Sequence, residues 1–576
     1  MHGKKIFAIL AMSVLLTLSY RNPSFTQPSS QEMSGEERQR EMLKKDEQLR
    51  QKIETEQKAP EAPPELTPAQ PPIESREKIN VKKIDVTGAT LVSANAIKII
   101  TAPLENKEIT IKELQKAADM ITDLYRQKGY ITSRAYLPPQ KITAEGIVEI
   151  RVLEGAMGDV TITGNRYFKT KLLRKKITLK KGEPFNYNLL RKDLVKINEH
   201  PDRFCKTVLA PGKEPGTTDL TLDVTDHLPI HVGMDWDNFG SRYIGKDRYS
   251  VRLTHNNLLG FDDKLTFQYQ MAQHSRYYLK NARYLLPVSP SLEMGLYAAL
   301  SRVKLGQEYE DSDARGKSQI YGVFANQSLV NTENFDMNLN LGFDYKDITN
   351  YQSQAVSSHD ELSVAKVGFD LDLSDTFGRT IFTYELDYGI PDFMGSMEEQ
   401  DGSASRSGAG GEFIKNNLNL LRLQKMPFSS TLLWKNQIQL SPYILTAAEQ
   451  FQVGGITNVR GYPPAEVVGD KGYSTTFELS TPVYLMPKKL VVPFTKAKTK
   501  IYDALRIVTF YDWGNVHLKR PLATEEKNKT LRSAGCGMRF NLPQNLSVRL
   551  EVAWPLDNTP SDANHTRTWV QVTKDF

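Results

Sequence analysis

An arginine and an aspartate in the C-terminal third of the chain are the side chains best suited to a specific charged contact. Arg460 lies in the tetrapeptide Val459–Tyr462, and Asp512 lies in the segment Phe510–Gly514. A guanidinium and a carboxylate can bond through two parallel hydrogen bonds. Arg460 is therefore a suitable partner for Asp512 if its loop folds toward that segment.

The segment that carries Asp512 alternates as a β-strand does, because successive side chains of a strand point to opposite faces. One face holds Arg506, Val508, Phe510, Asp512 and Gly514. The other holds Leu505, Ile507, Thr509, Tyr511 and Trp513. The second face is the more apolar, so Asp512 is expected to point away from an apolar surrounding.

The same alternation recurs from about residue 229 to the C-terminus, for example in Leu546–Trp554. Many segments have the ~9–11 residues that cross a bilayer as a tilted strand. An even number of such strands, with one face toward lipid and the other toward a polar lumen, is typical of bacterial membrane barrels. The pattern predicts sixteen antiparallel strands, centred on 231–237, 247–254, 264–271, 278–286, 291–301, 319–328, 335–346, 362–373, 379–388, 413–423, 431–440, 473–483, 504–513, 533–540, 546–554 and 566–576.

The connections between these strands alternate in length, as short periplasmic turns and long external loops would. Short connections fall at 374–378, 424–430 and 541–545, and long ones at 302–318, 389–412, 441–472 and 555–565. The long basic connection 484–503 breaks the rule. The longest external loop, 441–472, contains Arg460, and we expect it to fold into the lumen.

The N-terminus begins with basic residues and an apolar run that ends at Leu18, so residues 1–24 are interpreted as a secretory signal peptide rather than as an anchor helix. Residues 25–57 are rich in Glu, Lys, Gln and Arg with opposite charges at helical spacing, which predicts a polar helix or, equally, a disordered leader. Residues 58–77 form a Pro-rich linker.

Residues 78–228 form two similar α/β units, 78–155 and 156–228. In the first, Ile111–Lys128 is an amphipathic helix that stops at Gly129. The strand at Asp159–Asn165 then echoes Ile84–Gly88, which indicates an internal repeat of about 75 residues.

Composition and motifs argue against several classes of function. A net charge of +6 over 576 residues is a poor match to nucleic acid. The chain has no catalytic motif and no histidine spacing suited to a metal, so we expect no enzyme activity, no metal and no cofactor. Of its two cysteines, Cys205 is expected to be a buried free thiol and Cys536 a residue on a lipid-facing strand.

These features together resemble a TpsB transporter, the haemolysin secretion/activation protein of two-partner secretion. The resemblance rests on the Val-Arg-Gly-Tyr loop, the Phe-x-Asp-x-Gly strand, the segment Gly129–Pro138 and the order of the parts. It implies a sixteen-stranded transmembrane β-barrel, residues 229–576, preceded by two periplasmic α/β POTRA domains and an N-terminal polar helix.

The resemblance also assigns roles to single residues. The loop motif comprises Val459, Arg460, Gly461 and Tyr462, and the lumen-strand motif comprises Phe510, Asp512 and Gly514. Phe576 resembles the terminal aromatic residue that serves as the signal for barrel assembly.

The implied function is export of a large secreted exoprotein, such as a haemolysin, adhesin or toxin, that is bound in extended form by the POTRA domains. Outer-membrane lipid and the barrel-assembly machinery are further expected partners. An exposed sheet edge suits such a client, because strand addition uses main-chain hydrogen bonds. The polar helix and the inward loop are candidates to close the lumen.

Three other classes compete with this interpretation. A barrel-assembly insertase of the same superfamily tends to have more POTRA repeats and lacks the polar helix with a Pro-rich linker. A passive porin would need neither the repeats nor the loop motif. An outer-membrane enzyme has no supporting motif in the chain.

Overall fold

The computed structural model describes Met33 and residues 78–576, except 142–145, 333, 484–490, 492–499, 524, 543–544 and 558. The expected signal peptide 1–24, the linker 58–77 and, apart from Met33, the polar segment 25–57 lie outside the described residues, as does most of 484–503. Two compact units are described separately below. No helix among the described residues is long and apolar enough to cross a membrane.

The first α/β repeat buries one face of a long helix against a small sheet. Its elements are β1 (Lys78–Val81), β2 (Lys83–Thr87), α3 (Ala94–Thr101), η1 (Ala102–Leu104), β3 (Lys107–Thr110), α4 (Ile111–Gln127), β4 (Arg134–Tyr136) and β5 (Ile147–Leu153). A capping box of Thr110 and Glu113 starts α4, and Gly129, with φ of 91°, follows its end. Strand β5 lies between β2 and β4, while β1 pairs with β3.

The second repeat has the same topology. It contains β6 (Ala156–Thr163), α5 (Thr170–Lys175), α6 (Tyr187–Asn198), β7 (Arg203–Pro211) and β8 (Thr217–Asp226). Strands β6 and β8 are parallel, as β2 and β5 are in the first repeat, and β7 adds antiparallel to β8. Cys205 is buried in the core of this repeat.

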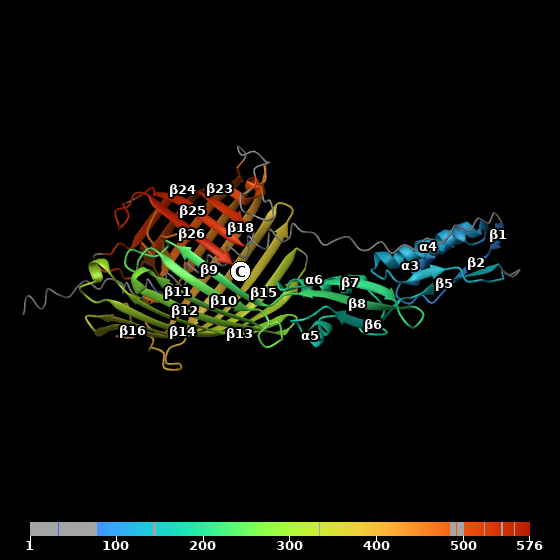
Figure 1. Cartoon of the computed structure of the whole chain (residues 1–576), viewed down its shortest axis with the longest axis horizontal. Coiled ribbons are helices and arrows are strands. Elements are labelled where there is room, and N and C mark those ends of the chain that lie inside the picture. Colours follow the sequence, from blue (N-terminus) through green and yellow to red (C-terminus); the bar gives the residue numbers. More distant parts are fainter. Residues whose placement is uncertain are drawn as a thin grey trace, which may run out of the picture. The chain divides into compact units, whose positions relative to one another are not determined.

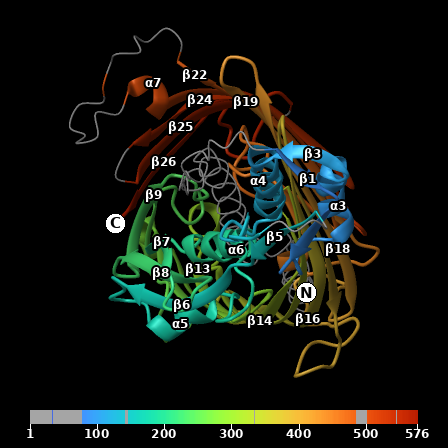
Figure 2. The ribbon, with the colours of Figure 1, turned by 90° about the vertical axis from the view of Figure 1, so that its right-hand side faces the viewer.

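Sixteen strands of the described residues close into one antiparallel barrel (Figure 1), and each corresponds to a strand predicted from the sequence. They are β9 (Ile230–Asp237), β10 (Arg248–His255), β11 (Lys264–Ala272), β12 (Tyr277–Ser289), β13 (Leu292–Lys304), β14 (Arg315–Asn331), β15 (Phe335–Gln352), β16 (Ala355–Asp375), β17 (Gly378–Gly389), β18 (Phe413–Met426), β19 (Ser430–Leu440), β22 (Lys471–Pro482), β23 (Leu505–His517), β24 (Asn528–Leu542), β25 (Leu546–Pro555) and β26 (Arg567–Asp575). Strand β26 pairs with β9 and closes the barrel. In Figure 2, which is turned by 90° from Figure 1, these strands surround a common interior.

Several strands are longer than the alternation predicted. Strand β15 has 18 residues and β16 has 21, and the two continue as a hairpin whose turn lies between Gln352 and Ala355. The predicted strands stopped at residue 346 and restarted at 362. Polar residues occupy both faces of the intervening stretch, so the period-two signal vanishes although the backbone ladder persists.

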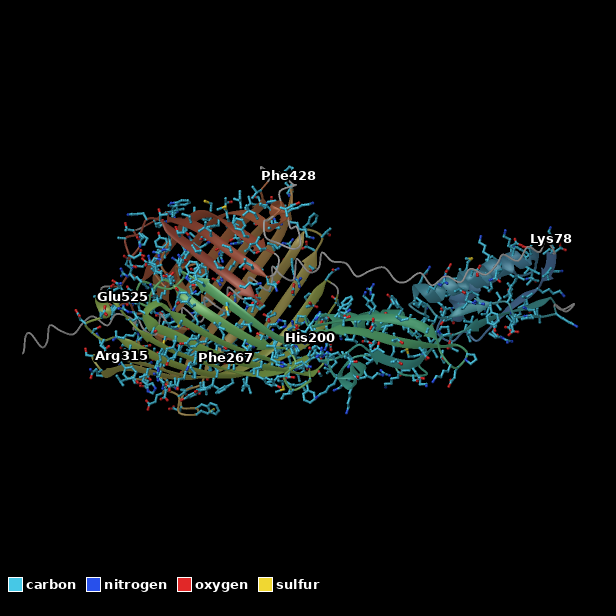
Figure 3. The ribbon with its side chains drawn as sticks, in the orientation of Figure 1. Lys78, His200, Phe267, Arg315, Phe428 and Glu525 are labelled. Carbon is cyan, nitrogen blue, oxygen red and sulfur yellow. The ribbon has the colours of Figure 1, made fainter. Side chains whose placement is uncertain are left out.

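The outer face of the barrel is apolar and the inner face is polar. In β23, Ile507 and Tyr511 are exposed on the outside, whereas Phe510 and Asp512 are buried inside. Figure 3 shows side chains around the barrel, among them Phe267, which is exposed on β11. Cys536 is exposed, as its place among outward residues of β24 predicted.

The connection from β19 to β22 folds back as a largely buried loop, residues 441–470, which we call the inward loop. It contains η4 (Ala447–Glu449), β20 (Phe451–Val453) and β21 (Val467–Gly469), and the last two pair with each other. Shorter 3-10 turns occur elsewhere at η2 (Gln273–Ser275) and η3 (Gln307–Tyr309), and a short helix, α7 (Ile501–Ala504), precedes β23.

Candidate functional site

The tip of the inward loop places Arg460 against Asp512 in a bidentate ion pair. Arg460 Nε donates to Asp512 Oδ2 at 3.0 Å, and Arg460 Nη2 donates to Asp512 Oδ1 at 2.9 Å. The backbone N–H of Arg460 also donates to Asp512 Oδ2 at 3.1 Å. Arg460 is 2% exposed and Asp512 is 0% exposed. The two charges are therefore held together inside the protein, away from bulk water.

Two further carboxylates and two further arginines complete this network. Arg460 Nη1 donates to Glu478 at 2.9 Å and to Glu551 at 3.0 Å. Arg539 donates to the same two carboxylates at 2.6 Å each, and Arg549 donates to Glu551 at 2.7 Å. Three arginines thus face three carboxylates, and the mutual pairing offsets the cost of removing these charges from water.

The register of four neighbouring strands brings the network together. Glu478 of β22 lies opposite Phe510 of β23, which lies opposite Gly535 of β24. Glu551 of β25 lies opposite Gly537 of β24. Because side chains alternate along a strand, Glu478, Phe510 and Glu551 all point into the lumen. The register of the strands places these three side chains close to one another.

Small residues make room for the loop tip. The Arg460 guanidinium carbon lies 3.3 Å from the centre of the Phe510 ring, a cation–π contact. A Cβ at Gly535 would lie 2.3 Å from the Phe510 ring, and one at Gly514 would lie 2.6 Å from Val453 of the loop. Gly514 thus leaves room for the inward loop itself, whereas Gly535 leaves room for the Phe510 ring on which Arg460 stacks.

The other three residues of the loop motif shape the turn that presents Arg460. Val459 and Tyr462 are buried in a small apolar cluster, and the N–H of Tyr462 donates to the Val459 carbonyl at 3.2 Å. A Cβ at Gly461 would lie 2.7 Å from the Cβ of Ser533, so the chain passes close to the wall there. Trp569 of β26 donates its Nε1–H to the Arg460 carbonyl at 2.8 Å.

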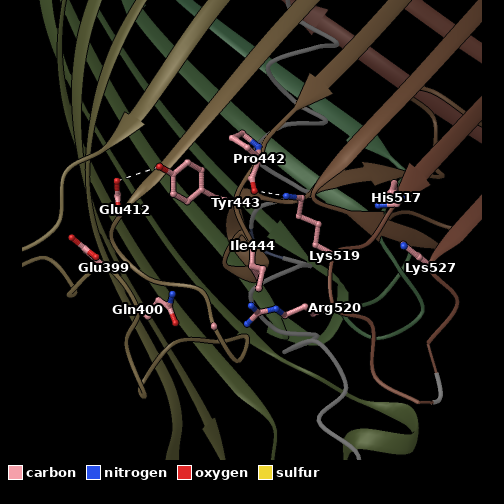
Figure 4. Close-up of a pocket in the computed structure, with 11 residues that line it drawn as sticks. Glu399, Gln400, Glu412, Pro442, Tyr443, Ile444, His517, Lys519, Arg520 and Lys527 are labelled. Carbon is pink, nitrogen blue, oxygen red and sulfur yellow. Dashed lines mark hydrogen bonds between the residues drawn. The ribbon is translucent and has the colours of Figure 1, made fainter.

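The two ends of the inward loop are tied together at the barrel mouth. Arg406 donates to Asp470 at 2.5 Å and to the Leu445 carbonyl at 2.8 Å, and the Leu445 N–H donates to Asp470 at 2.8 Å. Beside these contacts lies a cavity of about 510 Å³ (Figure 4). Its lining residues come from three segments, 399–412, 442–444 and 517–527. There Lys519 donates to the Pro442 carbonyl and Tyr443 donates to Glu412 at 3.2 Å.

The predicted terminal residue lies apart from this site. Phe576 is 64% exposed, and its N–H donates to the Val232 carbonyl of β9 at 2.8 Å. The Lys574 ammonium lies 4.8 Å from the Phe576 ring centre.

Sequence reasoning paired Arg460 with Asp512 but missed Glu478, Glu551, Arg539 and Arg549. The signal was present in part, because Arg549 and Glu551 occupy the polar face of the strand at 546–554. Alternation alone, however, does not say which polar residues of separate strands meet one loop.

Three family descriptions match successive parts of the chain. Residues 216–540 match the haemolysin secretion/activation protein family ShlB/FhaC/HecB, which is more than half of the chain. Residues 79–155 match the ShlB-type POTRA domain, and residues 156–204 match a surface antigen variable number repeat that is also a POTRA unit.

Curated relatives and solved structures agree with this match. The heme/hemopexin transporter protein HuxB of Haemophilus influenzae (strain 86-028NP) is 24% identical over 517 residues, which covers 86% of this chain and 87% of the relative. The outer membrane transporter CdiB of Dickeya dadantii is 24% identical over 71% of this chain and 73% of its own.

The structure of CdiB from Escherichia coli shares the fold, with a TM-score of 0.69 and 20% identity over 95% of this chain and 99% of that one. BamA from Haemophilus ducreyi has a related fold, with a TM-score of 0.55 and 12% identity over 87% of this chain and all of that one. The family match favours the secretion transporters over the insertase alternative. The chain therefore belongs to the haemolysin secretion/activation protein family, whose members are outer-membrane transporters with periplasmic POTRA domains.

Proposed function

We propose that this protein exports a large exoprotein through its barrel, and that the inward loop is the gate of that route. The protein is an outer-membrane transporter of two-partner secretion, as its family membership states. The observation that supports the gate is the burial of the motif residue Arg460 in the lumen network. A polypeptide passing through the barrel has to displace that loop.

The cargo is a secreted protein that is bound in extended form. One relative is named for heme/hemopexin transport and another for haemolysin transport, and the second supports a haemolysin among the proposed clients, which are a haemolysin, an adhesin or a toxin. Folding of the client outside the cell would make export directional without ATP. Barrel-assembly machinery that reads Phe576, and outer-membrane lipid around the outer face, complete the proposed partners.

Strand β7 of the second POTRA repeat is the proposed docking edge. Within the described residues β7 pairs with β8 alone, so its other edge is open for strand addition. Phe204 and Val208 are 53% and 57% exposed on it. The client's main chain would extend the sheet while these side chains add an apolar contact.

Co-expression with a candidate exoprotein tests the whole proposal. We expect the client in the medium only when the transporter is present, and client that accumulates in the periplasm regardless would contradict it. An insertase would instead change the amounts of other barrels in the membrane. For the docking edge, Val208→Glu is expected to weaken client binding about tenfold, whereas Ile147→Glu, at a position in the first repeat that is 45% exposed, serves as the matched control.

A further inference from the structure

The inward loop carries a second buried charge that contacts a different part of the barrel wall. Glu449, the last residue of η4, is 1% exposed. Its Oε1 accepts a hydrogen bond from Lys346 Nζ at 2.5 Å, and its Oε2 accepts one from Lys415 Nζ at 2.5 Å. These lysines lie on β15 and β18, whereas the carboxylate partners of Arg460 lie on β22, β23 and β25.

The carboxylate of Glu449 bridges two strands that are not neighbours. Two strands, β16 and β17, separate β15 from β18 in the barrel, and Lys415 also pairs with Asp387 of β17 at 3.0 Å. A buried ammonium group requires a nearby counter-charge. The loop therefore supplies a carboxylate to the lysines of β15 and β18, just as it supplies a guanidinium to the carboxylates of β22, β23 and β25.

Further hydrogen bonds hold the same stretch of the loop. Gln439 of β19 donates to the Glu449 carbonyl at 3.0 Å, and the Ala447 N–H donates to Ser405 at 2.9 Å. Glu449 and Arg460 both lie between Leu445 and Asp470, the two residues joined at the mouth. The segment between those ends cannot leave the lumen unless both charged contacts break.

We propose that Glu449 is a positioning residue of the export gate, and that its bridge to Lys346 and Lys415 is a second latch. Opening of the lumen requires release of this latch as well as of the Arg460 network. The export part of this inference rests on the proposed function, whereas the channel part concerns the closed barrel alone.

Single-channel recording in planar bilayers tests the latch on the purified full-length protein. Glu449→Gln is expected to raise the frequency of open events at least about tenfold, since it leaves the buried Lys415 and the partly buried Lys346 without that carboxylate. Glu466→Gln is the matched control, because Glu466 lies in the same loop but bonds Ser561 at 2.7 Å and 2.8 Å. Heat-modifiable migration in gel electrophoresis checks that the variant barrel is folded. An unchanged frequency of open events in folded Glu449→Gln would overturn the proposal.

A double-variant cycle separates the latch from a general loosening. Lys346→Gln should also raise opening, and the Glu449→Gln/Lys346→Gln double variant should open little more than the more open single variant. Independent, additive effects of the two substitutions would show that the two side chains do not act as one contact.

A cross-link tests the motion and does not depend on the folding of Glu449→Gln. Cysteines at positions 449 and 415, in a Cys205→Ser/Cys536→Ser background, are joined by a short bis-maleimide. We expect joining to abolish the openings and to cut export of the client at least about tenfold. Undiminished export by the joined chain would overturn the latch. Failure of the wild-type chain to export any client would instead refute the proposed function and leave the conductance result standing.

Discussion

Arg460 is the residue on which most of the lumen contacts converge. It makes hydrogen bonds to Asp512, Glu478 and Glu551, stacks on Phe510, and receives a bond from Trp569 at its carbonyl. A planar guanidinium can satisfy several acceptors at once, whereas an ammonium acts as a point charge. The site thus depends on arginine and not merely on a positive charge.

Replacement of Arg460 should release the loop tip. Arg460→Ala leaves three buried carboxylates facing two arginines, and breaking such a buried set typically costs about 3–5 kcal/mol. Because the gate opens only when this network breaks, we expect Arg460→Ala to raise the frequency of open events in planar bilayers at least about tenfold, and Arg460→Lys to give an intermediate value. Arg532→Ala, which removes a half-exposed pair with Asp557, is the control and should open no more often than the unchanged chain. An unchanged frequency of open events in Arg460→Ala would contradict the gate.

The thiol of Cys205 should react slowly and with a steep pH dependence. Burial raises the pKa of Cys205 to about 11. Because the thiolate is the nucleophile, only about one molecule in a thousand is reactive at pH 8. In a Cys536→Ser variant, labelling by a thiol reagent should accelerate about tenfold per pH unit between pH 7 and 10. Rapid labelling at neutral pH would mean that the second repeat opens readily.

At the scale of elements, Glu154, which directly follows β5, holds the turn that precedes α3 in the first repeat. It accepts hydrogen bonds from the N–H groups of Thr90 and Leu91 at 2.6 Å and 2.8 Å, and from the Tyr125 hydroxyl at 2.7 Å. Burial acts to raise the pKa of Glu154, but the hydrogen bonds from Thr90, Tyr125 and Leu91 outweigh it, so the pKa lies below its usual value.

This lowered pKa predicts how the turn responds to acid. A carboxylate whose pKa is lower in the folded state stabilises the fold above its unfolded pKa of about 4.3, and the contribution is lost as the pH falls through the folded value. Amide hydrogen exchange, corrected for intrinsic rates, should show protection around Thr90 falling between about pH 5 and pH 3. Glu154→Gln should already be weakly protected at pH 6 and should lack this pH dependence.

At the scale of the whole molecule, Met33, which precedes the POTRA repeats in the chain, packs against residues of the barrel. Met33 is 1% exposed and belongs to the same buried apolar cluster as Ile244, Tyr277 and Leu279 of the barrel and Ala448 of the inward loop. This contact supports the proposal that residues 25–57 help to close the lumen, because a buried apolar side chain is costly to expose.

Deletion of residues 31–57 should therefore raise ion conductance in planar bilayers. Met33→Asp should do so to a smaller extent, since it places a charge in the apolar cluster. Met120→Asp, at an exposed position of α4, is the matched substitution and should leave conductance unchanged. Equal conductance of the deletion variant and the intact chain would count against a plug.

The sequence by itself determined the barrel, its sixteen strands and the repeated α/β units, and it offered Arg460 as a partner for Asp512 on the condition that the loop folds inward. These are readable because alternation, helical periodicity and turn residues are local properties, and because the loop and strand motifs carry a family resemblance. The sequence did not predict the ends of β15 and β16 at their shared hairpin, because outside the membrane neither face of a strand needs to be apolar.

Only the tertiary structure decided which charges share a site. Glu551 meets Arg460 across 91 residues, and Glu449 meets Lys346 across 103. Such meetings depend on strand register around a closed barrel and on the path of one loop through its interior, and neither is encoded in the spacing of residues along the chain. The physical reason is that a buried charge requires a partner, while the sequence does not specify which distant residue will supply it.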